Sequence, residues 1–311
     1  MIEMKKYLMD FEEGKKEFLT ECKIRNLASD TIDYYTDGYN FFLKFINQET
    51  SIKVLQNINK GTIESYIMYM REQELEDTTI NIRLRAIRRI MYFFMENDYI
   101  DSFKIKLIKE EEKVPNLYTD EEIMKLIKKP NVKECNFAEF RTWAITNFFI
   151  ATGVRSRTLR NVRIKDLDFN NDLIWLFKNK NRKQFAVPMG YTIKKVLREY
   201  LKVRGGNDED YAFCNVEGEQ LTRYALSNVV SSYNRKRGVN KTGIHLYRHY
   251  FSKAYIQNGG NALKLQKLLG HSTLQETQRY VDLFGKDLQK DFDKFSPLDN
   301  IYRKKERIKM R

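Results

Sequence analysis

Apolar residues recur at helical spacing through the first third of the chain. The segment from Thr31 to Ile46 carries one apolar face, and Ser29 or Asp30 is its predicted N-cap. A second segment, from about Lys60 to Arg71, shows the same spacing. The apolar positions of the two segments are Ile32, Tyr35, Tyr39, Phe42, Ile46, Ile63, Ile67 and Met70. This part of the chain is therefore predicted to be helical.

A third helical segment, Thr78 to Asn97, has a basic side as well as an apolar one. Its apolar stripe consists of Ile80, Leu84, Ile87, Ile90, Met91 and Phe94. The arginines Arg85, Arg88 and Arg89 cluster on the opposite side. They form either a solvated face or a surface that contacts phosphates. Nothing in the sequence explains a further arginine, Arg83, within the apolar stripe.

The middle of the chain indicates a boundary between two domains. Residues 104–116 are charged, contain Pro115 and lack apolar periodicity, which is typical of a linker. We therefore predict a helical domain (1–105), a linker (106–117) and a second domain (118–311). Thr119 and Glu122 have the spacing of a capping box, so a helix is predicted to open the second domain.

The second domain is predicted to combine helices with a small sheet. Residues 172–188 read as a β-hairpin, because two apolar runs flank a polar turn at 178–183. Helices are predicted over residues 143–151, 192–203 and 222–236 and onwards to the C-terminus. The expected fold class is mainly α with a small β-sheet.

The excess of basic residues indicates a polyanionic partner. Lys and Arg number 56 against 42 Asp and Glu, a formal net charge of +14. Nucleic acid is the simplest such partner, although an anionic membrane surface or a gain in solubility would also account for the charge. No apolar run reaches the ~18 residues that span a bilayer, and the N-terminus has no signal-peptide pattern.

Cysteine and histidine are scarce. The three cysteines are scattered and match no motif, which indicates inert thiols in a reducing cytoplasm. The three histidines form no Cys/His cluster, so we expect neither a metal nor another cofactor.

Two of the histidines flank an arginine. Residues 242–249 read Thr-Gly-Ile-His-Leu-Tyr-Arg-His, which places His245, Arg248 and His249 on one face of a helix. A guanidinium between two imidazoles is costly as core packing but suits a site that grips an anion. Alone, the pattern is weak evidence.

The third histidine leads to a tyrosine. Residues 268–273 read Leu-Leu-Gly-His-Ser-Thr, and Tyr280 follows His271 by nine positions. Thr273 and Glu276 have capping-box spacing, so a helix is predicted to begin after His271 and to carry Tyr280 on its second turn. One tyrosine among 19 is by itself more often a core or surface residue than a nucleophile.

A further arginine follows a helix end upstream. Residues 151–155 read Ala-Thr-Gly-Val-Arg, so Gly153 is predicted to end a helix just before Arg155. Taken alone, this is a C-capping turn whose arginine points to water.

Together, these segments resemble the tyrosine recombinase (phage integrase) family in residue type, order and spacing. The matching elements are the turn ending at Arg155, the box from His245 to His249, and the Leu-Gly-His-Ser motif followed by Tyr280. Lys180 lies seven residues before Val187, where the family's strand-turn lysine would fall. The resemblance covers about residues 118–298, and the first third is more loosely similar to the family's core-type DNA-binding domain.

The resemblance implies that Tyr280 attacks a DNA phosphate and forms a 3′-phosphotyrosyl bond without a metal. Arg155 and Arg248 would present planar forks to the phosphate oxygens and stabilise the charge that develops there. His271 would donate a hydrogen bond to the same phosphate.

The resemblance also assigns the proton transfers. His245 would be the base that activates the phenol, and His249 would support the site without contacting the substrate. Lys180 would protonate the leaving 5′-hydroxyl, with Lys178 and Lys183 as the neighbouring alternatives.

One position departs from the family pattern. The family usually has a carboxylate three residues after the first arginine, where this chain has Thr158. A threonine can still form hydrogen bonds but supplies no charge beside the arginine. This leaves open an alternative function as a catalytically impaired DNA-binding regulator, and a topoisomerase-like relaxing activity is a third option.

The family's mode of action implies the partners. Double-stranded DNA would be clamped by both domains, with Arg85, Arg88 and Arg89 as the candidate contacts of the first. Two paired sites would be held by a homotetramer that exchanges C-terminal segments, with accessory DNA-bending proteins as an option. Such an enzyme would integrate, excise or resolve a mobile element. The basic tail, 301–311, would dock on a neighbour or on DNA, or would be merely solvated.

Overall fold

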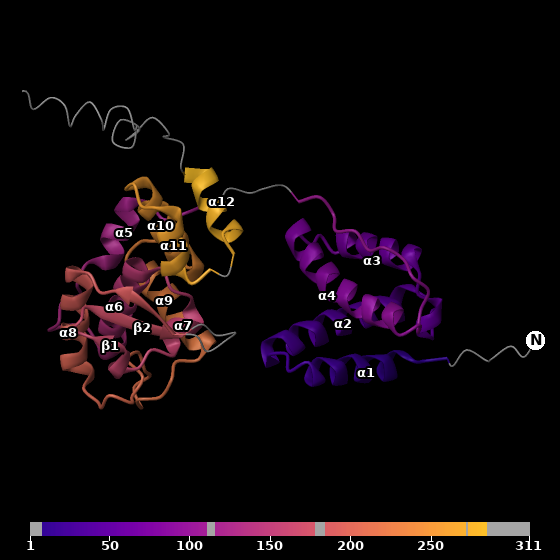
Figure 1. Cartoon of the computed structure of the whole chain (residues 1–311), viewed down its shortest axis with the longest axis horizontal. Coiled ribbons are helices and arrows are strands. Elements are labelled where there is room, and N and C mark those ends of the chain that lie inside the picture. The colour runs from indigo at the N-terminus through magenta and orange to yellow at the C-terminus, as the bar shows by residue number, and fades with distance from the viewer. Residues whose placement is uncertain (1–7, 111–115, 178–183, 272, 285–311) are drawn as a thin grey trace, which may run out of the picture. The chain divides into compact units, whose positions relative to one another are not determined.

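The chain folds into two compact units, residues 1–114 and 115–311. The computed structural model describes residues 8–110, 116–177, 184–271 and 273–284, and each unit is considered by itself (Figure 1). The expected fold class is confirmed, because the described residues form mainly α-helices with one small antiparallel sheet. No helix of these residues is long and apolar enough to cross a membrane.

The first unit packs its helices around an aromatic core. The helices are α1 (Phe11–Ile24), α2 (Ser29–Glu49), α3 (Lys60–Glu72) and α4 (Asp77–Glu96), with a 3₁₀ turn at Leu55–Asn57. The apolar stripes of α2, α3 and α4 meet there, and Phe42, Tyr66 and Phe94 are fully buried. The three predicted helices are thus present with bounds close to those expected.

The predicted N-cap of α2 is wrong. The cap residue is Ala28, not Ser29 or Asp30, and it contributes no side-chain hydrogen bond. The preceding helix α1 ends only a few residues earlier, and Asn26 turns the chain there with a φ of 52°. The helix α2 therefore begins as soon as the chain leaves this turn.

The unexplained Arg83 of α4 stacks on an aromatic ring. Its guanidinium carbon lies 3.5 Å from the ring centroid of Phe41 on α2. The half-buried arginine therefore belongs to the interface between α2 and α4, where a cation over an aromatic face is favourable.

The start of the predicted linker is attached to the first unit. Ile105 is buried in its core, and Leu107 and Ile108 pack against that core. The amide of Asn81 on α4 donates to the carbonyl of Ile108, and the Ile108 amide donates back to Asn81 at 3.0 Å. The division between the two units falls after residue 114, within the stretch 106–117.

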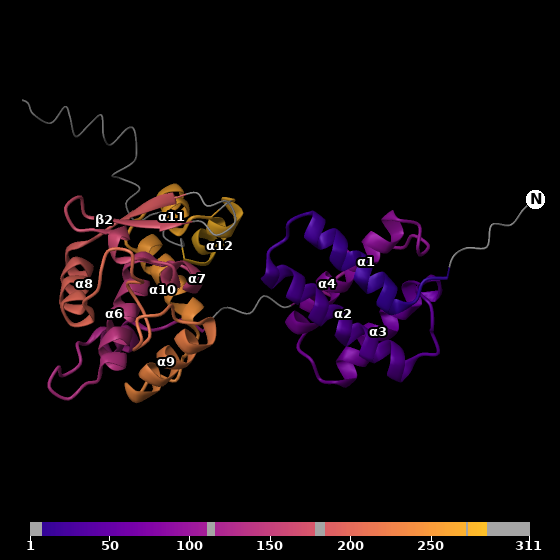
Figure 2. The same ribbon diagram turned by 90° about the horizontal axis from the view of Figure 1, so that it is seen from below.

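The second unit surrounds one central helix. Helix α6 packs against α5, α8, α9 and α10 and lies in the middle of the unit (Figures 1 and 2). The described helices are α5 (Asp120–Ile127), α6 (Phe137–Thr152), α7 (Ser156–Arg160), α8 (Tyr191–Arg204), α9 (Arg223–Lys236), α10 (Ile244–Gln257), α11 (Ala262–Leu269) and α12 (Gln275–Phe284), with a 3₁₀ turn at Ile164–Asp166. Both hydrogen bonds of the predicted Thr119–Glu122 capping box are present.

The sheet contains the predicted hairpin and one additional strand. Strands β2 (Leu173–Phe177) and β3 (Gln184–Pro188) are antiparallel, with Leu173 opposite Pro188. The short strand β1 (Leu167–Asp168) extends the sheet in the order β1-β2-β3. Ile174 and Leu176 of β2 and Val187 of β3 face the main core.

Helix α10 is anchored in the main core through Tyr247. Its ring is fully buried, stacks on Phe149 of α6 with centroids 5.9 Å apart and lies 4.7 Å from the ring of Tyr118. Its hydroxyl donates to Asn234 of α9 at 2.8 Å. These contacts fix the orientation of α10.

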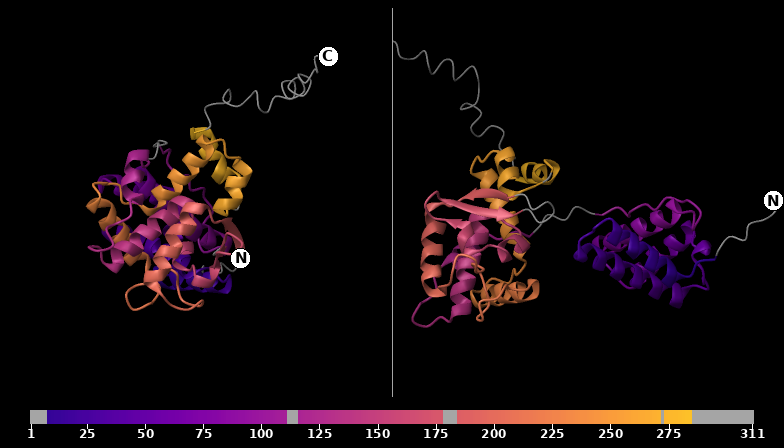
Figure 3. Two further views of the ribbon diagram at one scale, coloured as in Figure 1. Left: turned by 90° about the vertical axis from the view of Figure 1, so that its left-hand side faces the viewer. Right: turned by 60° about the horizontal axis from the view of Figure 1, so that its bottom comes forward.

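The helices α11 and α12 form a separate, smaller cluster with α10. Leu265, Leu269 and Tyr280 are its buried members, and Phe251 and Tyr255 of α10 pack against them. Figure 3 shows α11 and α12 together at one end of the unit, beside α10. The described residues of the second unit thus form two cores of unequal size.

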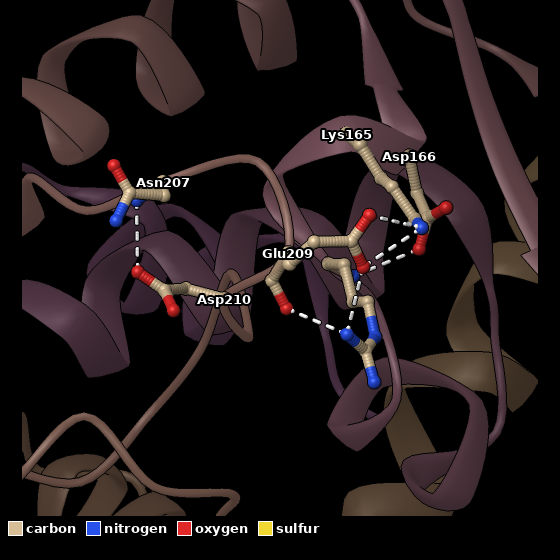
Figure 4. A network of polar contacts seen from close by, with 6 residues as sticks. Lys165, Asp166, Asn207, Glu209 and Asp210 are labelled. Carbon is tan, nitrogen blue, oxygen red and sulfur yellow. Dashed lines mark hydrogen bonds and ion pairs between the residues drawn. The ribbon is translucent and has the colours of Figure 1, made fainter.

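An ion-pair network ties the loop after α8 to the 3₁₀ turn. The ammonium of Lys165 lies 2.6 and 2.8 Å from the carboxylate oxygens of Glu209 (Figure 4). The carboxylate of Asp210 accepts a hydrogen bond from the backbone amide of Asn207. Arg163 donates to Glu209 as well. The hydrogen bond from Lys165 and the nearby cations lower the pKa of Glu209. Since these groups are exposed, the network orders the loop more than it stabilises the fold.

Candidate active site

Arg155 follows the end of the central helix. Helix α6 terminates at Gly153, which has a φ of 62°. A Cβ atom there would lie 2.4 Å from a ring carbon of Phe251, so both the turn and the packing require glycine. The exposed Arg155 is the N-cap residue of α7. The predicted C-capping turn is therefore present.

Helix α10 carries the His-x-x-Arg-His box on one face. His245 lies at the exposed surface, Arg248 is 6% exposed and His249 is half-buried. Partial desolvation, together with the positive charges of Arg248, Arg155 and Arg223, lowers the pKa of His245 below 6.5. The charges of Arg155 and Arg248 thus act together on one imidazole.

Arg248 connects the three motifs directly. One terminal nitrogen of its guanidinium donates to the carbonyl of Gly153 at 2.8 Å, and the other donates to the carbonyl of Leu269 at 3.1 Å. Gly153 lies two residues before Arg155, and Leu269 lies two residues before His271. Because both acceptors are at helix C-termini, they are favourable partners for a buried cation. Arg248 therefore holds the segments of Arg155 and His271 in place.

His271 is fixed by a threonine of the following helix. Gly270 caps α11 with a φ of 64°, and the amide of His271 donates to the carbonyl of Gln266. The imidazole Nδ1 lies 2.8 Å from the hydroxyl of the fully buried Thr277 on α12. This contact orients the ring of His271, which is itself 7% exposed.

Tyr280 lies on the second turn of α12, as predicted. It is 9% exposed, and its hydroxyl lies 3.0 Å from Nδ1 of His249. Its ring is nearly parallel to that of His271, with an interplanar angle of 9° and centroids 6.4 Å apart. The candidate nucleophile is thus enclosed by two of the three histidines of the chain.

The structure therefore brings together most of the predicted site residues. Tyr280 lies against both His249 and His271, and Arg248 ties their surroundings to the turn before Arg155. The helix predicted after His271 begins at Gln275, and the side chain of Glu276 lies outside the described residues, as do Lys178, Lys180 and Lys183.

The remaining predicted residues have other surroundings. Thr158 is buried on α7, at the position where the family usually has a carboxylate. In the first unit, Arg85 lies 3.3 Å from Glu110, and Arg89 lies 3.3 Å from Glu96. Arg88 is half-buried on the same helix.

Two features of the site were not predicted. Thr277 was not singled out, although its position three residues before Tyr280 places it on the same side of α12. The second feature is the contact of the Tyr280 hydroxyl with His249. Among the described residues, no group of three or more His, Cys, Asp or Glu side chains could hold a metal ion.

Comparison with known proteins identifies the family. The sequence pattern of the phage integrase family matches residues 116–286, which is more than half of the chain. Tyrosine recombinase XerC of Staphylococcus epidermidis is 28% identical over 289 residues, covering 89% of this chain and 94% of that protein.

Two solved structures share the fold. XerH site-specific recombinase bound to palindromic difH substrate, a post-cleavage complex, matches with a TM-score of 0.69 and 22% identity, over 89% of this chain and 83% of that one. A lambda integrase dimer bound to a COC′ core site matches with a TM-score of 0.70 and 15% identity, over 91% of this chain and 80% of that one. The family match, which spans every described element of the candidate site, leads to one conclusion: the chain belongs to the phage integrase family.

Proposed function

We propose that this protein is a tyrosine-type site-specific recombinase that cleaves and rejoins DNA strands through a 3′-phosphotyrosyl intermediate on Tyr280. The observation that carries the proposal is the hydrogen bond between Tyr280 and His249 on the helix whose Arg248 anchors the other two motifs. The names of the relatives, a tyrosine recombinase and a site-specific recombinase on its substrate, support it.

The site offers cations to the phosphate at which Tyr280 would react. Attack on phosphorus spreads negative charge over the non-bridging oxygens, and preorganised donors stabilise that charge. Arg155 and Arg248 would supply planar forks, while His271 would supply a single hydrogen bond. The proton of the phenol would pass to an imidazole of α10, because a phenol with a pKa near ~10 needs a base to attack.

Lys180 would complete the reaction as the acid that protonates the leaving 5′-oxygen. This assignment follows the family resemblance, since Lys180 lies outside the described residues. The phosphotyrosyl bond retains the energy of the broken phosphodiester. A second strand's 5′-hydroxyl can therefore reverse the reaction and join a new partner without ATP.

The first unit would hold the DNA through the basic side of α4. The ion pairs of Arg85 and Arg89 involve partly exposed side chains, so they contribute little and can be exchanged for phosphate contacts. We further propose that four copies assemble on two paired sites and exchange C-terminal segments, with or without DNA-bending proteins. The result would be integration, excision or resolution of a mobile element.

A nicked DNA substrate tests the proposal. Duplexes that bind the protein tightly would first be selected from a random-sequence pool and then nicked close to the cleavage position. The short fragment diffuses away after cleavage, so the covalent adduct accumulates and is visible on a denaturing gel. We expect an adduct with the wild-type protein and none with Tyr280→Phe, which retains DNA binding.

The other outcomes separate the alternatives. Tight binding without any adduct from the wild-type protein would refute the enzyme and favour the DNA-binding regulator. Relaxation of any supercoiled plasmid, whatever its sequence, would favour the topoisomerase-like activity.

A further inference from the structure

The hydroxyl of the nucleophile has a defined partner, and that partner is not the histidine that the family resemblance assigns as the base. The Tyr280 oxygen lies 3.0 Å from Nδ1 of His249, with the two rings tilted by 49°. His249 is half-buried one helical turn after His245. The sequence alone places both imidazoles on one face of α10, and the structure distinguishes them.

The distance suits direct proton transfer. A general base must lie within about 2.6–3.2 Å of the atom whose proton it accepts. A neutral imidazole with an unprotonated Nδ1 meets this requirement at His249 without any movement of α12. His245, by contrast, lies within the positive field of Arg155 and Arg248, the side chains proposed to grip the phosphate.

We propose that His249 is the general base for Tyr280, whereas His245 serves the phosphate. This inference rests on the proposed function. In the cleavage step, the phenolic proton moves to Nδ1 of His249 as the tyrosine oxygen forms its bond to phosphorus. The bond from phosphorus to the 5′-oxygen breaks, and that oxygen leaves with the bonding pair and takes a proton from the general acid.

The same residue serves the rejoining step. A 5′-hydroxyl attacks the phosphotyrosine, and the tyrosine oxygen leaves and recovers the proton from the His249 imidazolium. The contact between His271 and Thr277 holds α12 in register during both steps, since Thr277 and Tyr280 lie on one side of that helix.

Asparagine substitutions test the assignment. In His249→Asn, the amide oxygen occupies roughly the place of Nδ1, so the variant can still accept a hydrogen bond from Tyr280 but cannot take its proton. The matched variant is His245→Asn. On the nicked duplex, we expect His249→Asn to slow adduct formation by about 10²-fold or more, with DNA binding and the unfolding midpoint unchanged.

A more acidic phenol separates the two histidines. Replacing Tyr280 with 3,5-difluorotyrosine lowers the phenol pKa, so cleavage depends less on a base. The fluorinated phenol should recover most of the lost rate in His249→Asn and much less in His245→Asn. His249→Gln, which moves the amide away from Nδ1, should behave like His249→Asn and provides a second variant if the first is unstable.

Three results would overturn the inference, and they differ in what else they affect. Adduct formation at the wild-type rate in both His249 variants would return the role of base to His245. So would a recovery of the rate by the fluorinated phenol in His245→Asn alone. Either result would leave the proposed function intact. An absence of adduct from the wild-type protein would overturn the proposed function as well.

The contact itself can be checked without DNA. The chain has three histidines, so the imidazole nitrogens of ¹⁵N-labelled protein can be assigned from the single variants. Tyr280→Phe should move the Nδ1 resonance of His249 by much more than the resonances of His245. Equal shifts at both residues would contradict the contact.

Discussion

The two cores described in the second unit position different parts of the proposed active site. The main core fixes α6 and α10, and with them Gly153 and Arg248, through fully buried side chains such as Phe149 and Tyr247. The smaller cluster, in which Leu265, Leu269 and Tyr280 are the buried members among the described residues, fixes the helix of the proposed nucleophile.

The difference indicates how rigidity is distributed. A phosphate grip must be preorganised before charge develops, which favours a site built on a large core. A nucleophile held by a few buried side chains can leave its position at a modest cost in free energy. Tyr280 is itself one of those side chains, so the proposed nucleophile also helps to hold its helix in place.

Removing Arg248 should have the largest combined effect on cleavage and stability, because Arg248 links the two cores. Arg248→Ala loses two charge-assisted hydrogen bonds and leaves the carbonyls of Gly153 and Leu269 without their buried donor. We expect a loss of about 2–3 kcal/mol in the free energy of unfolding and no detectable cleavage. Urea unfolding and the nicked-duplex assay measure the two effects.

The control is Arg235→Ala, which removes an exposed arginine of α9. It should stay within about 0.5 kcal/mol of the wild-type protein. Equal losses in the free energy of unfolding in the two variants would show that Arg248 does not hold the three motifs in place.

A pair of leucine truncations compares the two cores directly. Leu197 of α8 and Leu265 of α11 are both fully buried, the first in the main core and the second in the small cluster. Leu197→Ala should lower the global free energy of unfolding by about 2–5 kcal/mol. Leu265→Ala should lower it less, while amide hydrogen exchange in α12 becomes faster. The comparison is contradicted if Leu265→Ala lowers the global free energy of unfolding more than Leu197→Ala does and amide hydrogen exchange in α12 is unchanged.

The smallest expected effect is on the pH dependence of folding stability, to which His245 contributes. Its pKa in the folded protein lies below 6.5, so the unfolded chain binds more protons around that pH. This contribution to stability is complete above about pH 6.5 and is lost as the pH falls through the folded pKa. His245→Asn should therefore lose less stability than the wild-type protein between about pH 7 and pH 5. A larger loss in the variant would contradict the sign of the shift.

Much of the fold could be predicted because it depends on local periodicity. Apolar spacing predicts the helix over 78–97, which is observed at Asp77–Glu96, and the Thr119–Glu122 capping box forms as expected. The N-cap of α2 could not be predicted, because the turn at Asn26 determines where that helix begins. Arg83 could not be explained from sequence either, since its partner Phe41 lies on another helix.

The candidate site could also be predicted only where it depends on local spacing. Motif order identifies the residues and their helix faces, because spacing within one helix determines which side chains share a side. Spacing does not determine which imidazole faces a tyrosine 31 residues away, since that depends on how α11 and the turn after it return the chain to α10. The hydrogen bonds from Arg248 to two backbone carbonyls could not be predicted either, because they too depend on how separate segments of the chain come together.

The most direct test of the central claim is the identity of the residue that becomes linked to DNA. The adduct trapped on the nicked duplex would be digested with trypsin, and the peptide attached to the DNA would be identified by mass spectrometry. Of the 19 tyrosines in the chain, we expect modification of Tyr280 alone, in the peptide that spans residues 280–286. DNA attached to any other residue would contradict it.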